Sequence, residues 1–256
     1  MNLESNMRLH RFYITQEIGD RTELTIDSAE LVNQVRRVFR LKPKDSIIVF
    51  NGTGIDYECK IDNYGEKNTI VSDSAIRLLV SSSSPSRYVP KVGLFLCTAM
   101  VKKDTFEWIT EKATELGVTG IVPIAAQRCE KKSLNEERLR KIAIEASEQS
   151  GRGTTPMVYA IMEPGEAAAF LKKENPEIKI VAFHTDGELF TRSDLAGFSA
   201  GKSPLAVFIG PEGGWSPSEI EMFHKLGIPV RCLGPQVLRT ETAVIAALSQ
   251  VVFDIK

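Results

Sequence analysis

The sequence has few of the residues that mark a metal, redox or membrane protein. Its 256 residues include only three histidines and four cysteines, Cys59, Cys97, Cys129 and Cys232, with no C-x-x-C pair. Zinc and redox motifs need closer spacing, so we expect no metal and read the cysteines as free thiols suited to a reducing compartment. No apolar run approaches the ~18 residues of a membrane span, and the N-terminus lacks the apolar core of a signal peptide. These absences predict a cytoplasmic protein without a membrane partner.

An excess of charge of one sign is also missing. The 32 basic and 33 acidic residues give a formal net charge of −1, which excludes a histone-like basic protein and an acidic tail protein. Nucleic-acid binding stays open, because a local basic face is sufficient for it. The 43% apolar and 25% charged residues are typical of a globular chain, and the length allows one or two domains.

The first 80 residues favour a small β domain. An apolar run at 47–50 is followed by Asn51-Gly52, a strong hairpin turn, and then by alternation of apolar and charged residues over 55–62. Residues 69–71 begin a further predicted strand. One helix, with Leu31, Val35 and Val38 on one face behind a Ser28 cap, interrupts the strands. Residues 81–90, SSSSPSRYVP, have no periodicity and predict a linker.

Residues 91–256 change to alternating strands and helices. Nearly continuous apolar runs are typical of parallel strands buried on both faces, and they occur at 92–97, 121–125, 178–183 and 205–209. Helix start and stop signals lie between and after these runs, at Asp104 to Gly117, Ser133 to Gly151 and Ser216 to Gly227. A last helix at 242–253 is apolar almost all round and is expected to be buried. The pattern predicts an α/β domain.

A glycine-rich loop follows the predicted strand that ends at Ile209. It reads Gly210-Pro211-Glu212-Gly213-Gly214 and precedes the helix with the capping box Ser216-Pro217-x-Glu219. α/β proteins hold ligands at such turns, although a turn without a ligand is the simpler alternative. No nucleotide fingerprint is present, neither G-x-G-x-x-G nor G-x-x-x-x-G-K-[ST]. The Glu212 carboxylate would repel a triphosphate and tolerate a neutral or cationic ligand, such as a nucleoside sulfonium.

A second irregular loop, residues 233–243, precedes the last helix. Arg239 and Glu241 could form an ion pair with each other, with Glu241 as a carboxylate favoured by the dipole at the helix start, or they could act on a ligand; the residues alone leave both open. Each of the two loops follows a strand and precedes a helix, so both could lie at one edge of one sheet.

The two loops carry a resemblance to a known family. GPEGGWSPSEIEMF followed by LGPQVLRTETAVIAAL closely resembles the ribosomal RNA uridine-N3 methyltransferases of the SPOUT class, the RsmE family. MRLHRFYI, KKDTFEWITEKATELGVTGIVPI and KIAIEASEQSGRGTTP are similar to other segments of that family, in the same order along nearly the whole chain. Met7 matches the usual family start, so residues 1–6 look like an extension or an alternative choice of start codon, and the stretch 129–151 looks shorter than is usual.

The resemblance implies a fold, a cofactor and partners. Residues 1–80 would form a PUA-like β-barrel that holds RNA, and residues 91–256 an α/β domain with a deep trefoil knot, in a homodimer. The cofactor would be S-adenosylmethionine, and the reaction would be methylation of N3 of a uridine in 16S ribosomal RNA of the small subunit. The residues that would bind the cofactor are His184, Ile209, Gly210, Pro211, Glu212, Gly213, Gly214, Leu233, Gly234, Val237, Leu238, Arg239 and Thr242. Phe183 and Thr185 would complete the wall beside His184.

Candidate catalytic and RNA-binding residues follow from the chemistry of methyl transfer to an imide nitrogen. Uracil N3 must lose its proton, for which Glu212, Glu241 and His184 are candidate bases, and Arg239 could stabilise charge on the uracil oxygens. Basic residues that could contact RNA, or could be ordinary solvated charges, are Arg8, His10, Arg11, Lys102, Lys103, Arg128 and Arg152.

Two other functions are compatible with parts of the sequence. A non-catalytic RNA-binding or ribosome-assembly factor could retain the same fold, but both cofactor-loop motifs look intact. A nucleotide-dependent enzyme could use the glycine loop for phosphate, but the phosphate-binding lysine is missing and Glu212 is present.

Overall fold

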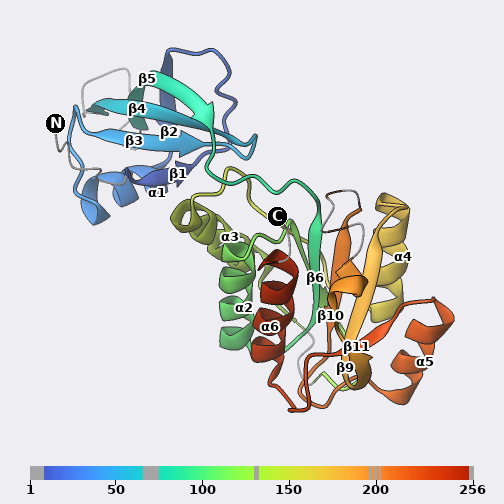
Figure 1. The fold of residues 1–256 in the computed structure, drawn as a ribbon. Helices are drawn as coiled ribbons and strands as arrows, with labels where there is room; N and C mark the ends of the chain where they lie inside the picture. Colours follow the sequence, from blue (N-terminus) through green and yellow to red (C-terminus); the bar gives the residue numbers. More distant parts are fainter. Residues whose placement is uncertain are drawn as a thin grey trace. The chain divides into compact units, whose positions relative to one another are not determined.

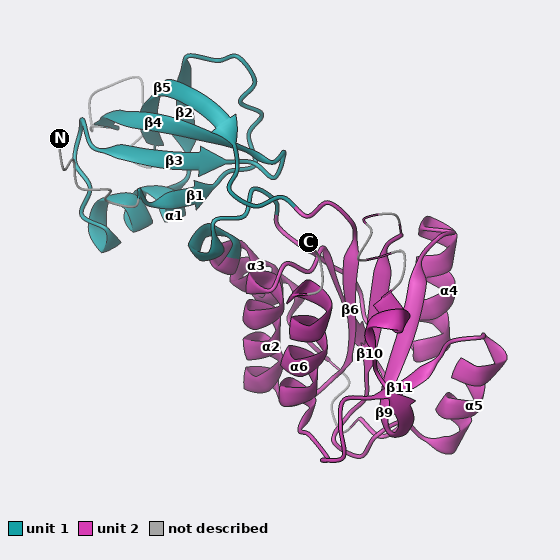
Figure 2. Ribbon diagram, in the orientation of Figure 1, with its two compact units in different colours: residues 1–89, 147–154 teal, residues 90–146, 155–256 magenta. Residues whose placement is uncertain are grey.

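The computed structural model describes residues 9–65, 75–129, 133–195, 198, 201 and 203–253. The chain divides into two compact units, one of residues 1–89 and 147–154 and the other of residues 90–146 and 155–256 (Figures 1 and 2). The first unit thus includes a short segment from the middle of the chain, which the sequence did not predict. Backbone hydrogen bonds hold this segment, from Gly153 N to Tyr88 O at 2.9 Å and from Gly54 N to Gly153 O at 3.1 Å.

Unit 1 is built on a five-stranded sheet with the order β1-β3-β4-β5-β2. Its strands are β1 (Arg11–Tyr13), β2 (Glu23–Asp27), β3 (Ser46–Phe50), β4 (Ile55–Tyr64) and β5 (Ala75–Pro85). All neighbours pair antiparallel except β1 and β3. The predicted hairpin around Asn51-Gly52 is confirmed as the turn between β3 and β4. The strand expected at 69–71 lies outside the described residues.

The predicted helix of unit 1 is confirmed at its start and wrong at its end. Ser28 caps α1 (Ala29–Asn33), with its Oγ accepting from Leu31 N at 3.2 Å. The chain then widens into the π-helical η1 (Gln34–Val38). This widening rotates the following side chains, so Val35 is buried while Val38 is 63% exposed.

The linker predicted at 81–90 is wrong for its first half. Residues 81–85 are the end of β5, and Ser82, Ser83 and Ser84 pair with the start of β4. These serines are exposed, so the strand end has no apolar alternation for a sequence pattern to detect.

Unit 2 contains a six-stranded sheet with the order β11-β9-β10-β6-β7-β8, in which every pair is parallel. Its strands are β6 (Leu94–Ala99), β7 (Gly120–Ile124), β8 (Met157–Val158), β9 (Lys179–Leu189), β10 (Leu205–Ile209) and β11 (Val230–Cys232). The four predicted apolar runs are confirmed as β6, β7, β9 and β10. β9 continues six residues past Phe183, the predicted end, and its extension pairs with β11.

Helices cover both faces of this sheet (Figure 1). One face packs against α2 (Lys103–Glu115), α3 (Glu136–Ser150) and α6 (Thr240–Phe253), the other against α4 (Pro164–Glu174) and α5 (Pro217–Lys225). Alternate residues of each strand enter the two cores: Leu94 and Leu96 face the first, Phe95 and Cys97 the second. The predicted α/β architecture is therefore confirmed.

The helix ends differ slightly from the sequence pattern. The first helix of unit 2 begins at Lys103, so Asp104 lies in its first turn instead of capping it. The last helix begins at Thr240 and buries only one face, since Val244 and Leu248 are buried while Phe253 is 81% exposed. Among the described residues, no helix is long and apolar enough to cross a membrane.

Candidate functional site: a pocket at the carboxyl edge of the parallel sheet

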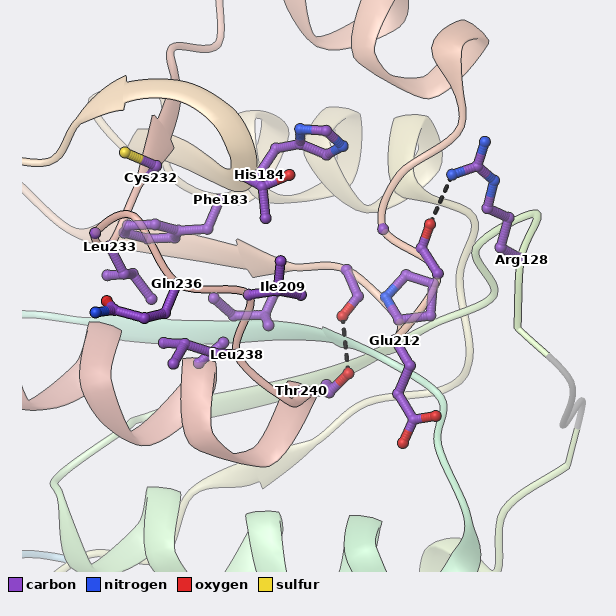
Figure 3. Close-up of a pocket in the computed structure, with 18 residues that line it drawn as sticks. Arg128, Phe183, His184, Ile209, Glu212, Cys232, Leu233, Gln236, Leu238 and Thr240 are labelled. Atoms are coloured by element: carbon purple, nitrogen blue, oxygen red, sulfur yellow. Dashed lines mark hydrogen bonds between the residues drawn. The ribbon is translucent and has the colours of Figure 1, made fainter.

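Three chain segments meet at the carboxyl ends of adjacent strands of unit 2. The middle of β9 supplies Phe183 to Thr185, beside the end of β10; the glycine loop follows β10, and the loop after β11 leads into α6. Together they enclose a cavity of about 360 Å³ (Figure 3). The residues that line it are Arg128, Phe183, His184, Thr185, Ile209, Gly210, Pro211, Glu212, Gly213, Gly214, Cys232, Leu233, Gly234, Gln236, Val237, Leu238, Thr240 and Ala243.

The glycine loop packs closely against its supports. A Cβ on Gly210 would lie 3.2 Å from the ring of Trp215, which is buried and donates from Nε1 to Phe183 O at 3.0 Å. Gly214 has a left-handed backbone, φ +67°, and a Cβ there would lie 3.3 Å from His184 Nε2. Any larger residue at these positions would push against Trp215 or His184, so glycine lets the loop approach both side chains closely. A ligand in the cavity meets backbone at this wall.

The second loop closes the opposite wall. Thr240, the first residue of α6, donates from Oγ1 to Gly210 O at 3.2 Å and so joins the two loops (Figure 3). Ile209, Leu233 and Leu238 give the cavity an apolar side. The combination of an apolar wall and the backbone of the glycine loop suits a flat, partly polar molecule such as a nucleoside.

His184 is held in one orientation at the cavity edge. The backbone N–H of Asp186 donates to its Nδ1 at 3.2 Å. In the neutral imidazole the proton therefore lies on Nε2, the nitrogen beside Gly214. A neutral His184 in this tautomer donates from Nε2, and the base role considered from the sequence stays a prediction.

The predicted cofactor-binding residues gather in this cavity with two exceptions, Arg239 and Thr242. Both are exposed, because α6 begins between them and turns successive side chains in different directions. Leu238, Thr240 and Ala243 face the cavity instead.

The start of α6 also separates the three candidate catalytic residues, of which one lines the cavity and two do not. Glu212 lines the cavity and is exposed at its rim, with its carboxylate pointing away from His184 (Figure 3). Arg239 and Glu241 lie on α6 or just before it and do not line the cavity.

Arg128 is a pocket residue that the sequence placed only among the RNA-binding candidates. Its Nη1 donates to Gly213 O at 2.6 Å, and its side chain lies exposed at the cavity mouth (Figure 3). No motif marks Arg128 as a pocket residue, because it lies more than 80 positions from the glycine loop along the chain. Cys232 also lines the cavity and was missed, although it lies directly before the second loop; Gln236 of that loop lines the cavity as well.

Two of the predicted RNA-binding arginines are buried in unit 1, which corrects the expectation that they face RNA. Arg11 pairs with Asp56 and donates from Nη2 to Arg152 O at 3.0 Å, and Ser86 donates to the same aspartate. Arg152 is 1% exposed, and burial lowers its pKa to about 10. Guanidinium groups in such positions support the packing of the 147–154 segment and cannot reach a phosphate.

The other basic candidates lie at the surface or outside the described residues. Lys102 and Lys103 are exposed at the start of α2, and His10 is exposed beside Phe39, with ring centroids 4.2 Å apart. Arg8 is outside the described residues. No cluster of three or more metal-ligating side chains occurs within the described parts of the chain.

A parallel sheet with two ligand loops at its carboxyl edge defines an α/β protein with a nucleoside-sized pocket, and comparison with known proteins narrows this class. Residues 89–252 match the model of the RNA methyltransferase domain. The chain is 32% identical to ribosomal RNA small subunit methyltransferase E of Rickettsia conorii, over 96% of each protein. It is 29% identical to the Bacillus subtilis protein of the same name, over 96% of this chain and 97% of that one.

A solved structure shows the same fold. It is a ribosomal RNA small subunit methyltransferase E from Neisseria gonorrhoeae bound to S-adenosyl methionine, 25% identical, with a TM-score of 0.80 over 94% of this chain and 96% of that one. The chain therefore belongs to the RNA methyltransferase family of the ribosomal RNA small subunit methyltransferase E proteins. The SPOUT-type α/β fold predicted from the resemblance is confirmed.

Proposed function

We propose that this protein transfers a methyl group from S-adenosylmethionine to N3 of a uridine in 16S ribosomal RNA of the small subunit. Family membership supports the reaction class. The observation that carries the proposal is the meeting of the glycine loop and the loop after β11 in one cavity, joined by the Thr240–Gly210 hydrogen bond.

The cavity fits the cofactor chemically. Its apolar side, formed by Ile209, Leu233 and Leu238, suits an adenine ring, and the glycine loop offers backbone groups at close approach. The Glu212 carboxylate at the rim favours a cation over a polyphosphate. When bound, the cofactor supplies a methyl group on a positively charged sulfur. We propose that the predicted cofactor-binding residues that line the cavity hold it, and that Arg239 and Thr242 do not.

The residues around the rim would then act on the uracil. Among the described residues, Glu212 is the single carboxylate that lines the cavity. We therefore propose that Glu212 accepts the proton that uracil N3 must lose. Arg239 extends into solvent between Leu238 and Thr240, which both line the cavity. From there it can reach a base entering from outside and stabilise negative charge on O2 or O4. His184 would donate from Nε2 and hold a neighbouring acceptor atom.

RNA would be held outside the cavity by exposed basic side chains. Lys102, Lys103 and Arg128 belong to unit 2, and His10 to unit 1, whose β-sheet we propose acts as a PUA-like RNA-binding domain. The target base must leave its stack before it can enter the site. We further propose that the protein works as a homodimer, with the knot of its family, in the cytoplasm, where small subunits are assembled.

The test is methyl transfer to small subunits from a strain that lacks the modification. Labelled S-adenosylmethionine is supplied, and the mark is mapped by mass spectrometry. A label on uridine N3 is the expected result; a label on another atom, or none, would contradict the proposal. A titration with S-adenosylhomocysteine against ATP separates the cofactor classes, and tight binding of ATP alone would overturn the choice.

The Arg239→Ala variant tests the assigned charge stabilisation. We expect turnover to fall while the affinity for S-adenosylhomocysteine stays unchanged, because Arg239 lies outside the cavity. Wild-type turnover in this variant would remove Arg239 from the mechanism.

A further inference from the structure

Glu219 on α5 is a buried carboxylate that lines no part of the cavity. It nevertheless connects the start of α5, after the glycine loop, to the segment after β7. It is 5% exposed. Its Oε2 accepts from the backbone N–H of Ser216 at 2.7 Å, which completes the capping box of the helix. Its Oε1 accepts from the backbone N–H of Gln127 at 2.9 Å, 92 positions away in the sequence. Both oxygens of this carboxylate are therefore used.

The bond to Gln127 places the neighbouring residue, Arg128. Ser218 adds a second link by donating to Gln127 Oε1 at 3.1 Å. One residue further along, Arg128 reaches Gly213 O at the cavity mouth (Figure 3). The segment after β7 is thus tied to α5 by its backbone and to the glycine loop by the Arg128 side chain.

We propose that Glu219 is a positioning residue that holds Arg128 at the cavity mouth, where the arginine binds an anionic group of the acceptor RNA. A guanidinium has five N–H donors, and the bond to Gly213 uses one of them. The remaining donors lie at an exposed position beside the cavity, which suits a phosphate. This role rests on the proposed function of the cavity.

A carboxylate is required at residue 219 because both of its partners are N–H donors. Glutamine keeps one acceptor oxygen, but its amide group would meet the other backbone N–H donor to donor. Glu219→Gln should therefore free either the start of α5 or the Gln127 segment. The start of α5 keeps a second cap bond, from the backbone N–H of residue 219 to Ser216 Oγ, so we expect the backbone N–H of Gln127 to lose its acceptor, while Ser218 still contacts the Gln127 side chain.

Glu166 of α4 provides a matched control. It is the corresponding residue of a second capping box, on a helix that also begins with proline, and it accepts from Glu163 N at 3.4 Å. Glu166 does not line the cavity. Glu166→Gln therefore makes the same substitution at the same capping-box position without touching Arg128.

The experiment compares Glu219→Gln, Arg128→Ala, their double variant and Glu166→Gln with wild type, using small subunits from the unmodified strain. We expect the first two variants to raise KM for the subunits by about tenfold each, the effect of losing one charge-assisted contact. The slope of log affinity against log salt should fall by about 1 in both. The double variant should be no worse than Arg128→Ala, because Glu219 acts through that arginine. Glu166→Gln should keep the wild-type KM.

Additive losses in the double variant, or a wild-type KM in Glu219→Gln, would overturn the positioning role. If Glu219→Gln fails to fold, hydrogen exchange of wild type decides: the Gln127 amide should be strongly protected, and fast exchange there would refute the bond. RNA binding and amide exchange are measured without turnover. A wild-type protein that binds RNA but transfers no methyl group would therefore contradict the proposed function alone.

Discussion

Gly214 and Gly227 share a left-handed backbone angle of φ +67° but differ in their surroundings. A Cβ on Gly214 would lie 3.3 Å from His184 Nε2, whereas a Cβ on Gly227 would meet nothing within 4 Å. Alanine in this conformation costs roughly 1–2 kcal/mol. Both Gly214→Ala and Gly227→Ala should therefore lower the free energy of unfolding by about this amount. We expect only Gly214→Ala to weaken cofactor binding.

The size of the binding effect follows from the contact with His184. A 3.3 Å approach is tighter than ordinary van der Waals contact, so His184 or the loop must move. Overpacking of this type costs about 1–3 kcal/mol, which corresponds to roughly a five- to hundredfold loss of affinity if it falls on the pocket. Calorimetric titration with S-adenosylhomocysteine measures the affinity. Thermal unfolding measures the backbone cost, at about 2–4 °C per kcal/mol for a domain of roughly 150–250 residues.

Comparison of Gly214→Ala with Gly227→Ala can also refute the prediction. Wild-type affinity in Gly214→Ala, together with a loss of stability equal to that of Gly227→Ala, would show that the pocket does not depend on the approach of the loop to His184. An equal loss of affinity in both variants would assign the effect to general destabilisation.

Three further predictions concern charges. Burial raises the pKa of Asp194, but a backbone hydrogen bond and the Arg231 guanidinium outweigh it and hold the pKa below 3.8. A carboxyl pKa depressed by folding stabilises the protein above its unfolded pKa and loses this contribution as the pH falls, so Asp194→Asn should flatten the acid limb of unfolding curves below about pH 4. Asp56→Ala should leave the buried Arg11 without its carboxylate and lower the free energy of unfolding by about 3–5 kcal/mol in denaturant titrations; a loss under about 1 kcal/mol would contradict this. Lys102→Ala should reduce the salt slope of RNA binding by about 1, with stability unchanged, and an unchanged slope would remove Lys102 from the RNA contacts.

The fold could be predicted from the sequence wherever burial requires a recognisable pattern of apolar residues. β6, β7 and β10 are buried along their whole length, so their apolar runs are continuous and were found close to their observed ends, whereas the partly exposed second half of β9 was not found. The serines at 82–84 form part of β5 without any apolar residue, and their pairing with β4 depends on a neighbouring strand. The 147–154 segment joins unit 1 through backbone bonds to Tyr88 and Gly54, which no local pattern encodes.

The two ligand loops could be predicted because turn chemistry is local. Glycine, proline and the capping box at Ser216 mark where the chain leaves the sheet, and the structure brings both loops together as expected. The orientation of individual side chains could not be predicted. Arg239 is flanked by residues that line the cavity, yet its own side chain is exposed, since the start of α6 decides which way each residue points.

For the basic residues too, the sequence did not predict which side chains are buried and which are exposed. Arg128 lies in a predicted loop without glycine, and Arg152 lies between two glycines. Neither segment has apolar periodicity, and sequence reasoning assigned both arginines to RNA. The structure buries Arg152, whose backbone oxygen accepts from Arg11 Nη2, and leaves Arg128 exposed at the cavity mouth. What separates them is the partner that each loop meets after folding: Glu219 holds the Arg128 segment beside a ligand cavity, whereas the Arg152 segment meets the β-sheet of unit 1. On the proposal above, Glu219 governs an RNA contact that it does not make, because it holds the backbone next to Arg128.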